Sequence, residues 1–363
     1  MIIKLNNEMT SNKTKIINTL SKLLEQKNLA QIRAVVRDVK KDVEKFSRAK
    51  GRIHNISFNE ETTKVRSKYL FGELDQILDT RTIERTKYYI QRLVRSLSEI
   101  KTGKINDLNL HRWKEYADIL TDSLWVFKKR DTSGAHSGGY WGNFIPQIPN
   151  QLLRRYTKRG EWVLDAFLGS GTTLIESRRL GRNGVGVELR RKVATSAAKT
   201  IKQKDGSSPT RTEIIIGDSS NLNFKSELNN RKIRSVQFLI MHPPYWDIIK
   251  FSKDKRDLSN AKSIDEFLIL FGKIVDATYP VLDKGRYFAL VIGDKYSGGN
   301  WIPLGFYAMQ EVLKRGYSLK SIIIKNFDET KGKRNQKELW RYRALVGGFY
   351  IFKHEYIFVF KKV

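Results

Sequence analysis

Three acidic residues stand directly after short apolar runs. Asp165 follows Trp-Val-Leu, Glu188 ends Gly-Val-Gly-Val-Glu, and Asp218 ends Ile-Ile-Ile-Gly-Asp. If these runs are parallel strands, their carboxyl ends meet at one edge of a sheet, where open α/β sheets bind ligands. A carboxylate at position 188 can accept hydrogen bonds from both ribose hydroxyls of an adenosine ligand. Asp218 is placed to meet an adenine amino group or its neighbours.

A glycine-rich turn follows the first of these acids. In Val-Leu-Asp-Ala-Phe-Leu-Gly-Ser-Gly-Thr-Thr, residues 163–173, Gly169 and Gly171 permit tight turning and a close approach of the backbone to a ligand. No lysine follows these glycines as it does in a phosphate-binding P-loop, which argues against an NTPase. A dinucleotide-binding fold would fit the turn equally well. Three acids at three successive strand ends are the stronger signal.

A fourth strand end has the sequence Leu-Ile-Met-His-Pro-Pro-Tyr-Trp, residues 239–246. Proline fixes φ and has no amide hydrogen, so the strand must stop at Pro243. A plain loop needs neither two prolines nor two large aromatic residues at this point, so His242, Pro243, Pro244 and Tyr245 are candidates for a functional segment.

The elements that position these residues can be predicted from hydrophobic periodicity. Apolar runs predict strands at 162–167, 184–189, 213–218, 235–242, 285–294, 319–327 and 355–363, with helical patterns between most of them. One helix begins after Ser263, with Glu266 completing a capping box. The alternation predicts an α/β fold with a Rossmann-like, doubly wound and largely parallel sheet over residues 131–363. The last two strands could form an antiparallel hairpin at its edge.

The first 130 residues have a different character. Apolar residues at helical spacing predict helices over 12–50, 60–100 and 110–127. We therefore expect a mainly helical domain at 1–130. The glycine- and serine-rich stretch 130–144 has the composition of a linker.

Composition points to a polyanionic partner. The 363 residues carry a formal net charge of +30, with a pI near 10.0, and the charge is spread over both halves of the chain. The absence of cysteine excludes disulfides, cysteine–zinc sites and a cysteine nucleophile. No membrane-spanning run or signal-peptide pattern is evident, so we expect a cytoplasmic protein with no membrane partner.

Two basic stretches could contact nucleic acid or could be ordinary solvated loops. They are residues 250–260 and 328–343, the second of which also contains Trp340 and Tyr342. The side chain of Trp246 could either pack within its own domain or touch a base. The nucleic-acid-binding candidates are Trp246, Lys250, Lys253, Lys333, Arg334 and Arg341.

These motifs together resemble those of the S-adenosylmethionine-dependent amino-methyltransferases of DNA. Residues 165–173 match the family's Asp-Pro-Phe-x-Gly-Ser-Gly-Thr-Thr with Ala166 in place of proline, and 242–245 match its (Asp/Asn/Ser)-Pro-Pro-(Tyr/Phe). Residues 142–153 resemble the segment over the cofactor's methionine end, and 354–362 resemble the closing strand. The resemblance covers roughly 136–363. It implies that His242, Pro243, Pro244 and Tyr245 are catalytic, because neutral His242 and the carbonyl of Pro243 can accept the two hydrogens of an exocyclic amine and Tyr245 offers a ring on which a base can stack. It also implies a cofactor site made of Phe144, Ile145, Asp165, Phe167, Gly169, Ser170, Gly171, Thr172, Glu188, Asp218 and Ser219.

The resemblance further implies transfer of a methyl group to an exocyclic base amine in double-stranded DNA, after the base has been flipped out of the helix. No metal is required, and we assign none to the lone residues His136 and His354. His242 departs from the family pattern, in which Ser is commoner in cytosine-N4 enzymes and Asp or Asn in adenine-N6 enzymes. Family frequency slightly favours adenine N6. Protonated histidine has no acceptor nitrogen, so we predict that activity needs neutral His242 and falls on acidification.

Two other functions remain open at this point: methylation of a base amine in RNA, and a non-catalytic subunit that binds DNA or cofactor. The segment between the two motifs is too short for a target-recognition domain. We therefore expect residues 1–130, or a second subunit, to read the DNA sequence. A restriction endonuclease is a further candidate partner.

Overall fold

The computed structural model describes residues 14–50, 53–58, 61–136, 139–202, 209–327 and 337–363, and these form two compact units. Unit 1 comprises the described residues up to Gly103 together with Leu108–Asp118, and unit 2 comprises Lys104–Asp107 and the described residues from Ile119 onward. The sequence suggests a boundary at residue 130. Residues 119–130 belong to unit 2, where β3 (Leu124–Trp125) pairs with a strand of the sheet.

Unit 1 is mainly helical but also contains a hairpin. Its described helices are residues 14–22, α2 (Leu29–Lys50), α3 (Ser67–Leu78), α4 (Ile83–Ser98) and the 3₁₀ helix η1 (Leu110–Tyr116). β1 (Ile53–Phe58) and β2 (Glu61–Arg66) pair antiparallel. The helix expected over 60–100 is therefore wrong at its start, where Thr62, Thr63 and Val65 favour a strand. The helix expected over 110–127 ends at Tyr116.

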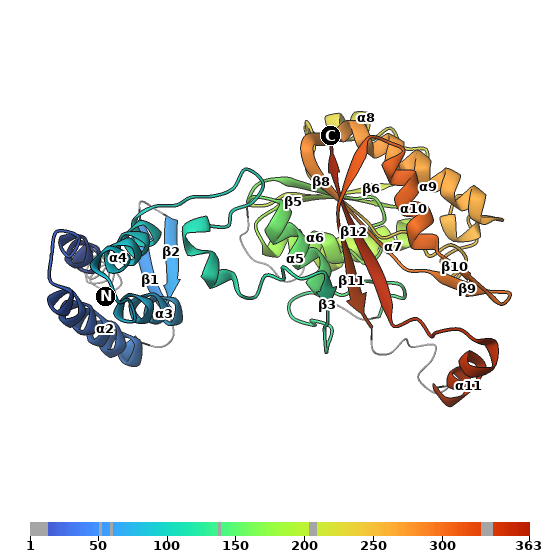
Figure 1. Ribbon diagram of the computed structural model, residues 1–363. Helices are drawn as coiled ribbons and strands as arrows, with labels where there is room; N and C mark the ends of the chain where they lie inside the picture. Colours follow the sequence, from blue (N-terminus) through green and yellow to red (C-terminus); the bar gives the residue numbers. More distant parts are fainter. Residues whose placement is uncertain (1–13, 51–52, 59–60, 137–138, 203–208, 328–336) are drawn as a thin grey trace. The chain divides into compact units, whose positions relative to one another are not determined.

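Unit 2 is built on an eight-stranded mixed sheet in the order β3-β11-β12-β8-β7-β4-β5-β6 (Figure 1). Its other strands are β4 (Trp162–Asp165), β5 (Asn183–Glu188), β6 (Thr212–Ile216), β7 (Val236–Met241), β8 (Leu282–Ile292), β11 (Tyr317–Asn326) and β12 (His354–Lys362). All seven predicted strands are present. The last two pair antiparallel as expected, but β12 lies inside the sheet, between β11 and β8, and β3 occupies the edge.

Helices cover both faces of this sheet. They are α5 (Gln147–Tyr156), α6 (Thr172–Arg179), α7 (Arg191–Lys202), α8 (Phe224–Asn230), α9 (Ile264–Thr278) and α10 (Leu304–Leu313). In β8, Phe288 and Leu290 join an apolar cluster with α8, α9 and α10, whereas Ala289 and Val291 join a cluster with α5. This two-residue alternation is what a strand buried on both faces requires. The α/β fold class is confirmed.

Local signals explain where the helices begin. The hydroxyl of Ser263 accepts a hydrogen bond from the Glu266 amide (3.1 Å) and caps α9, as predicted. The Glu266 carboxylate reaches back to the amide of Lys262 rather than to that of Ser263.

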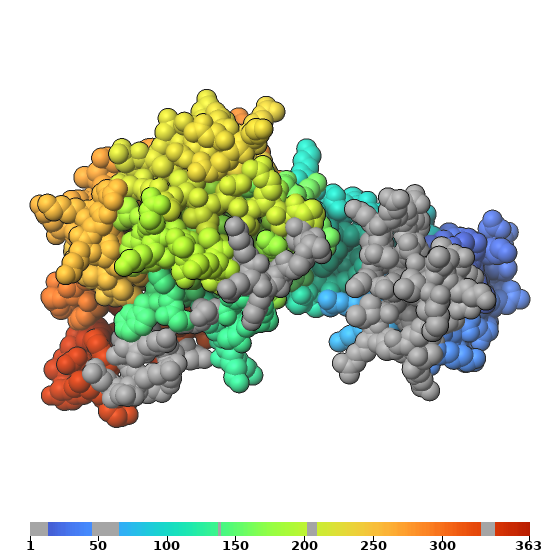
Figure 2. Space-filling view, turned by 180° about the vertical axis from the view of Figure 1, so that it is seen from behind, coloured from blue at the N-terminus to red at the C-terminus, as the bar shows by residue number. Residues whose placement is uncertain are grey.

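The visible face of unit 2 in Figure 2 is formed largely by the yellow-green and yellow segments, which include α7 and α8.

The strand order creates a crevice at one place in the sheet. The chain runs outward from β4 through β5 to β6, and then returns to place β7 on the other side of β4. The helices after β4 and after β7 therefore leave in opposite directions, which opens a ligand-binding crevice at the strands' carboxyl ends.

The remaining short elements are η2 (Leu258–Asn260), η3 (Tyr279–Val281), the hairpin β9 (Lys295–Ser297) and β10 (Asn300–Ile302), and α11 (Lys337–Gly347). Within the described ranges, we find no helix with the length and apolar character needed to cross a membrane.

Candidate active site

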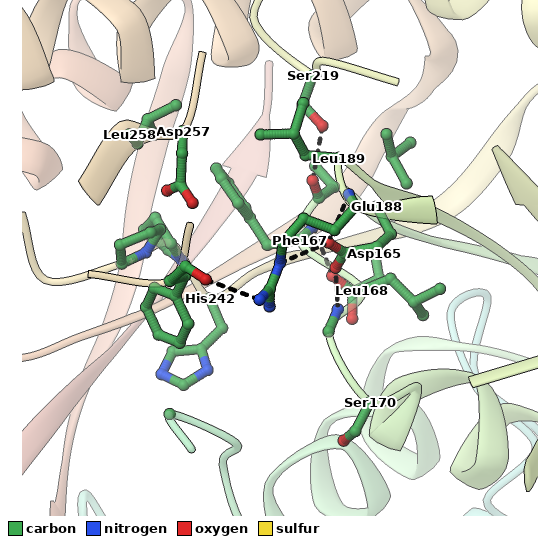
Figure 3. A pocket seen from close by; sticks show the side chains of 18 of the residues that line it. Asp165, Phe167, Leu168, Ser170, Glu188, Leu189, Ser219, His242, Asp257 and Leu258 are labelled. Carbon is green, nitrogen blue, oxygen red and sulfur yellow. Dashed lines mark hydrogen bonds and ion pairs between the residues drawn. The ribbon is translucent and has the colours of Figure 1, made fainter. Parts of the chain in front are cut away.

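A pocket opens at this switch point and gathers residues from the ends of four strands (Figure 3). It encloses about 850 Å³ of empty space, including its open mouth. Of the predicted cofactor and catalytic residues, it is lined by Phe144, Asp165, Phe167, Gly169, Ser170, Thr172, Glu188, Asp218, Ser219, His242, Pro243 and Pro244. Ile145, Gly171 and Tyr245 are outside this lining. The sequence therefore brings most of the distant candidates to one place.

Asp165 lies at the end of β4 and is only 2% exposed. Its carboxylate accepts a hydrogen bond from the Phe167 amide (2.9 Å), which holds the start of the glycine-rich turn. Burial raises the pKa of Asp165 to about 6, and the nearby charge of Glu188 acts in the same direction. A buried acid with so few partners is poised to interact with a cationic or hydrogen-bond-donating ligand.

Glu188 is held by two backbone donors at the end of β5. One carboxylate oxygen accepts from the Gly169 amide and the other from the Arg190 amide, both at 3.0 Å. Burial raises the pKa of this group, although both amides and the Arg190 guanidinium oppose the shift. Each oxygen keeps a lone pair for a further donor, as an acid that binds two ribose hydroxyls requires.

The two glycines of the turn have different roles. Gly169 lines the pocket with φ at +53°, and a Cβ there would lie 3.2 Å from the Tyr140 ring. Gly171 has φ at +87° and begins α6, where a Cβ would lie 3.0 Å from Ile201. Gly169 thus admits close contact with a ligand and a ring, while Gly171 lets α6 pack against α7.

Tyr140, Arg190 and Phe251 form one wall of the pocket, which the sequence did not reveal. The Arg190 guanidinium donates to the Phe251 carbonyl (2.7 Å) and to the Tyr140 hydroxyl. The rings of Tyr140 and Phe251 stack with centroids 6.4 Å apart. These contacts join residues that are 50 to 111 positions apart in the sequence, so no local pattern marks them. Only the position of Arg190, two residues after Glu188, gave a hint.

Asn143 lies in the 142–153 segment that the resemblance places over the cofactor, but it was not itself among the predicted site residues. Its side-chain oxygen accepts from the Thr172 hydroxyl (2.6 Å), which fixes the orientation of the amide group. Its Nδ2 atom is buried and has no hydrogen-bond partner among the residues that the structure describes. Because an unpaired buried donor costs roughly 1–3 kcal/mol, this atom indicates a missing acceptor in the pocket.

Asp218 and Ser219 follow the end of β6. Asp218 has a carboxylate oxygen that can bind a ligand, whereas the hydroxyl of Ser219 is already hydrogen-bonded within the protein. One oxygen of Asp218 accepts from the amide (2.9 Å) and the hydroxyl (2.8 Å) of Ser220. The other oxygen is not used in these bonds. Ser219 lines the pocket, but its hydroxyl donates to the Ala166 carbonyl (2.7 Å) and so ties this loop to the glycine-rich turn.

His242 follows the end of β7, with its ring packed against that of Phe144 (centroids 4.9 Å apart). Burial lowers the pKa of His242 to about 4, with Lys325 contributing and Glu355 opposing. The imidazole is therefore neutral at physiological pH and retains one acceptor nitrogen. The sequence predicts that activity falls on acidification. With this lowered pKa, we expect the fall at a lower pH than for an ordinary histidine.

Tyr245 is placed differently from the open base platform that the sequence suggests, and Trp246 takes the packed position, one of the two that the sequence left open. The Tyr245 hydroxyl interacts with His242 Nε2 (3.1 Å) and donates to Glu355 (2.7 Å). The Trp246 indole donates to the Ala261 carbonyl (2.9 Å), and Lys295 lies over its ring at 3.9 Å. Both rings pack against the apolar core. Trp246 therefore packs within its own unit.

The predicted nucleic-acid contacts lie outside the pocket lining. Lys250, Lys253 and Arg341 are exposed. Lys333 and Arg334 lie outside the described residues. The 250–260 loop is nevertheless close to the site, because its residues Arg256 and Asp257 line the pocket.

Comparison with known proteins extends this picture. The family model described as DNA methylase matches residues 6–199, more than half of the chain, and includes the glycine-rich turn but not His242. The type II methyltransferase M.MjaII of Methanocaldococcus jannaschii is 32% identical over 77 residues, covering 21% of this chain and 14% of the relative. The type II methyltransferase M2.DpnII of Streptococcus pneumoniae is 32% identical over 100 residues, covering 26% and 34%. The matched segments thus span only 14% and 34% of the lengths of these two relatives.

Solved structures show weaker similarity. TrmN of Thermus thermophilus has a TM-score of 0.39 at 19% identity, covering 61% of this chain and 49% of that one. A S-adenosylmethionine-dependent methyltransferase of Methanosarcina mazei has a TM-score of 0.39 at 13% identity, covering 58% and 97%. The methyl donor implied by the family is S-adenosylmethionine. On the match over residues 6–199, the chain belongs to the DNA methylase family.

Proposed function

We propose that this protein transfers a methyl group from S-adenosylmethionine to an exocyclic amine of a base in DNA. The observation that carries the proposal is the shared pocket. Acids at the ends of β4 and β5 and the His-Pro-Pro segment at the end of β7 line one cavity at the switch point. A nucleotide-like ligand and a base amine could therefore meet there.

The residues of the pocket suit this cofactor. Glu188 has free acceptor capacity for ribose hydroxyls, and Asp218 keeps one oxygen for an adenine amine. The unpaired Nδ2 of Asn143 is a donor suited to a carboxylate such as that of a methionine moiety. When bound, the cofactor supplies a methyl group activated by a sulfonium.

The His-Pro-Pro segment would hold the substrate amine. The lone pair of an aromatic amine is delocalised into the ring, so acceptors for its two hydrogens favour the pyramidal, nucleophilic form. His242 and the Pro243 carbonyl can act as these acceptors. In the transfer, a nitrogen–carbon bond would replace the carbon–sulfur bond of the sulfonium, and the proton that the nitrogen loses would pass to solvent. The lowered pKa makes His242 a hydrogen-bond acceptor rather than the final store of that proton.

We further propose adenine N6 as the acceptor in preference to cytosine N4, on family frequency, and a role in DNA modification. The relatives named as type II methyltransferases are consistent with that role. Partnership with a restriction endonuclease is an additional proposal of the same kind.

Methyl transfer to nucleic acid would test the proposal. The protein is incubated with labelled S-adenosylmethionine and either mixed-sequence duplex DNA or tRNA, and the products are digested to nucleosides. We expect N6-methyladenine from DNA. N4-methylcytosine would correct the base, label in tRNA alone would favour an RNA enzyme, and cofactor binding without transfer to either would favour a non-catalytic subunit.

A matched pair of histidine variants tests the role of the segment. We expect His242→Ala to bind cofactor normally but to lose at least about 100-fold in kcat, the order of magnitude for removing one positioned hydrogen-bonding group. His354→Ala, which removes a histidine outside the pocket lining, should retain wild-type kcat. Equal activities of the two variants would contradict the role of His242.

A further inference from the structure

A buried ion pair lies behind the His-Pro-Pro segment and makes no contact with the pocket. Lys325 on β11 and Glu355 on β12 are direct neighbours across the sheet, and their charged groups are 3.1 Å apart. The two residues are 6% and 7% exposed. Removing both charges from water costs several kcal/mol of stability. A pair of apolar residues of similar volume in their place often makes a protein at least as stable. A role other than stability is therefore indicated.

The ion pair is connected to the pocket through Tyr245. The second oxygen of Glu355 accepts a hydrogen bond from the Tyr245 hydroxyl at 2.7 Å. Burial opposes ionisation of Glu355, but Lys325 and its other partners hold the pKa of Glu355 below its ordinary value. Burial raises the pKa of Tyr245 well above its ordinary value. Glu355 is thus an anionic acceptor and Tyr245 a neutral donor.

The direction of the Tyr245–Glu355 hydrogen bond determines which ring nitrogen of His242 carries the proton. The hydroxyl has one hydrogen, and a bond to a carboxylate is shorter and stronger than one to a neutral imidazole. The distances agree, at 2.7 Å to Glu355 and 3.1 Å to His242 Nε2. With its hydrogen committed to Glu355, the Tyr245 oxygen can only accept from His242, so Nε2 must carry the imidazole proton.

We propose that Glu355 and Lys325 are positioning residues that act through Tyr245 to fix His242 as the Nε2–H tautomer, which leaves Nδ1 as the acceptor for the substrate amine. The inference deepens the proposed function and rests on it for the identity of the substrate. The other tautomer would present Nδ1–H, a donor, to an amine that needs acceptors. Tyr245 then matches the family motif in residue type but acts through its hydroxyl rather than as an open stacking face.

A matched set in the same unit provides the control. His354 Nε2 contacts the Tyr356 hydroxyl at 3.2 Å, and this hydroxyl donates to Asp294 at 3.1 Å. The geometry repeats the histidine–tyrosine–acid arrangement of the first set. None of these three residues lines the pocket. Tyr356→Phe therefore removes an equivalent hydroxyl without altering the site.

The experiment measures the tautomer directly. In full-length protein labelled with ¹⁵N in histidine, the chemical shifts of the ring nitrogens distinguish Nε2–H from Nδ1–H, and loss of one signal set in His242→Ala identifies His242. We expect Nε2–H in the wild type, a mixture of tautomers in Tyr245→Phe and in Glu355→Gln, and no change at His242 in Tyr356→Phe. The kcat for methyl transfer should fall about tenfold in the first two variants, the effect of losing one hydrogen bond, with cofactor affinity unchanged.

Two outcomes would overturn the inference: Nδ1–H at His242 in the wild type, or a pure Nε2–H form that survives in Tyr245→Phe. Neither outcome depends on detecting methylation. If the wild type shows Nε2–H at His242 but transfers no methyl group to any nucleic acid, the proposed function fails while the tautomer assignment stands. If a variant does not fold, the wild-type spectrum still overturns the inference when it shows Nδ1–H at His242.

Discussion

His242 and Asp165 show how the same burial shifts a base and an acid in opposite directions. Burial disfavours the charged form of each, so it lowers the pKa of His242 to about 4 and raises that of Asp165 to about 6. Both groups therefore spend more of the pH range neutral than they would in water. The two shifts lead to different experiments.

The first experiment concerns the pH dependence of kcat. With His242 neutral until the pH approaches 4, kcat at saturating cofactor should be flat from about pH 8 to about pH 5.5. An unshifted histidine, with a pKa near 6.5, would instead lose about tenfold at the lower end of this range. Saturation keeps protonation of Asp165 and Glu188 out of the measurement. A tenfold fall centred near pH 6.5 would contradict the burial of the imidazole.

The second experiment concerns the stability cost of Asp165. Its folded pKa of about 6 is above the ordinary value, so the destabilisation appears as the pH rises from about 4 to 6 and is complete above that range. Asp165→Asn should therefore raise the free energy of unfolding at pH 7 by about 1–3 kcal/mol and weaken cofactor binding. Urea denaturation at pH 7 and at pH 4 measures the difference in free energy of unfolding between the variant and the wild type. If this difference is equally large at pH 4, it does not come from the raised pKa of Asp165.

At the scale of elements, the strand ends form the site. Apolar runs followed by an acid or by proline can be recognised from sequence, because burial on both faces gives continuous hydrophobic strands. Asp165, Glu188 and His242 were placed in this way. The Tyr140–Arg190–Phe251 wall could not be, because its contacts join distant loops. The Lys325–Glu355 pair depends on the register of two strands, and the two-residue β3 is too short to produce a periodic signal.

Gly293, which directly follows β8, tests how strand ends position the site. A Cβ at this residue would lie 2.8 Å from the Tyr245 ring, so Gly293→Ala must displace that ring. We expect a loss of about 1–3 kcal/mol in stability and a lower kcat. Gly72→Ala in α3 meets no atom within 4 Å and should stabilise by up to about 1 kcal/mol. The two variants are compared by thermal unfolding and by methyl transfer. A Gly293→Ala variant with wild-type stability and wild-type kcat would show that the position of the Tyr245 ring does not need to be fixed.

At the scale of the whole molecule, the net charge of +30 favours association with DNA. We propose that unit 1 contributes to this binding through the outer face of α4. Arg85 and Arg95 are exposed there, and the Arg85 guanidinium lies over the Tyr88 and Tyr89 rings at 5.8 and 5.2 Å. Guanidinium and aromatic groups on one helical face are suited to phosphates and bases.

Charge reversal tests the role of this face. Arg85→Glu with Arg95→Glu should weaken DNA binding, and should lower the slope of log affinity against log salt by about 2 if each arginine contacts one phosphate. The control, Lys22→Glu with Lys27→Glu, changes two exposed residues outside α4 by the same total charge. Fluorescence anisotropy with duplex DNA at several salt concentrations measures both. Equal losses in the two variants would indicate a general charge effect.

The position of β12 inside the sheet has a consequence for protein synthesis. The glycine-rich turn, His242 and Tyr245 leave the ribosome well before Glu355 does, and β8 has no partner on that side until β12 arrives. An unfinished chain can contain the entire pocket lining and still be unable to orient its histidine. On the proposed role of Glu355, methyl transfer would therefore reach its full rate only after β12 has joined the sheet, which is later in translation than the synthesis of the last residue of the pocket lining.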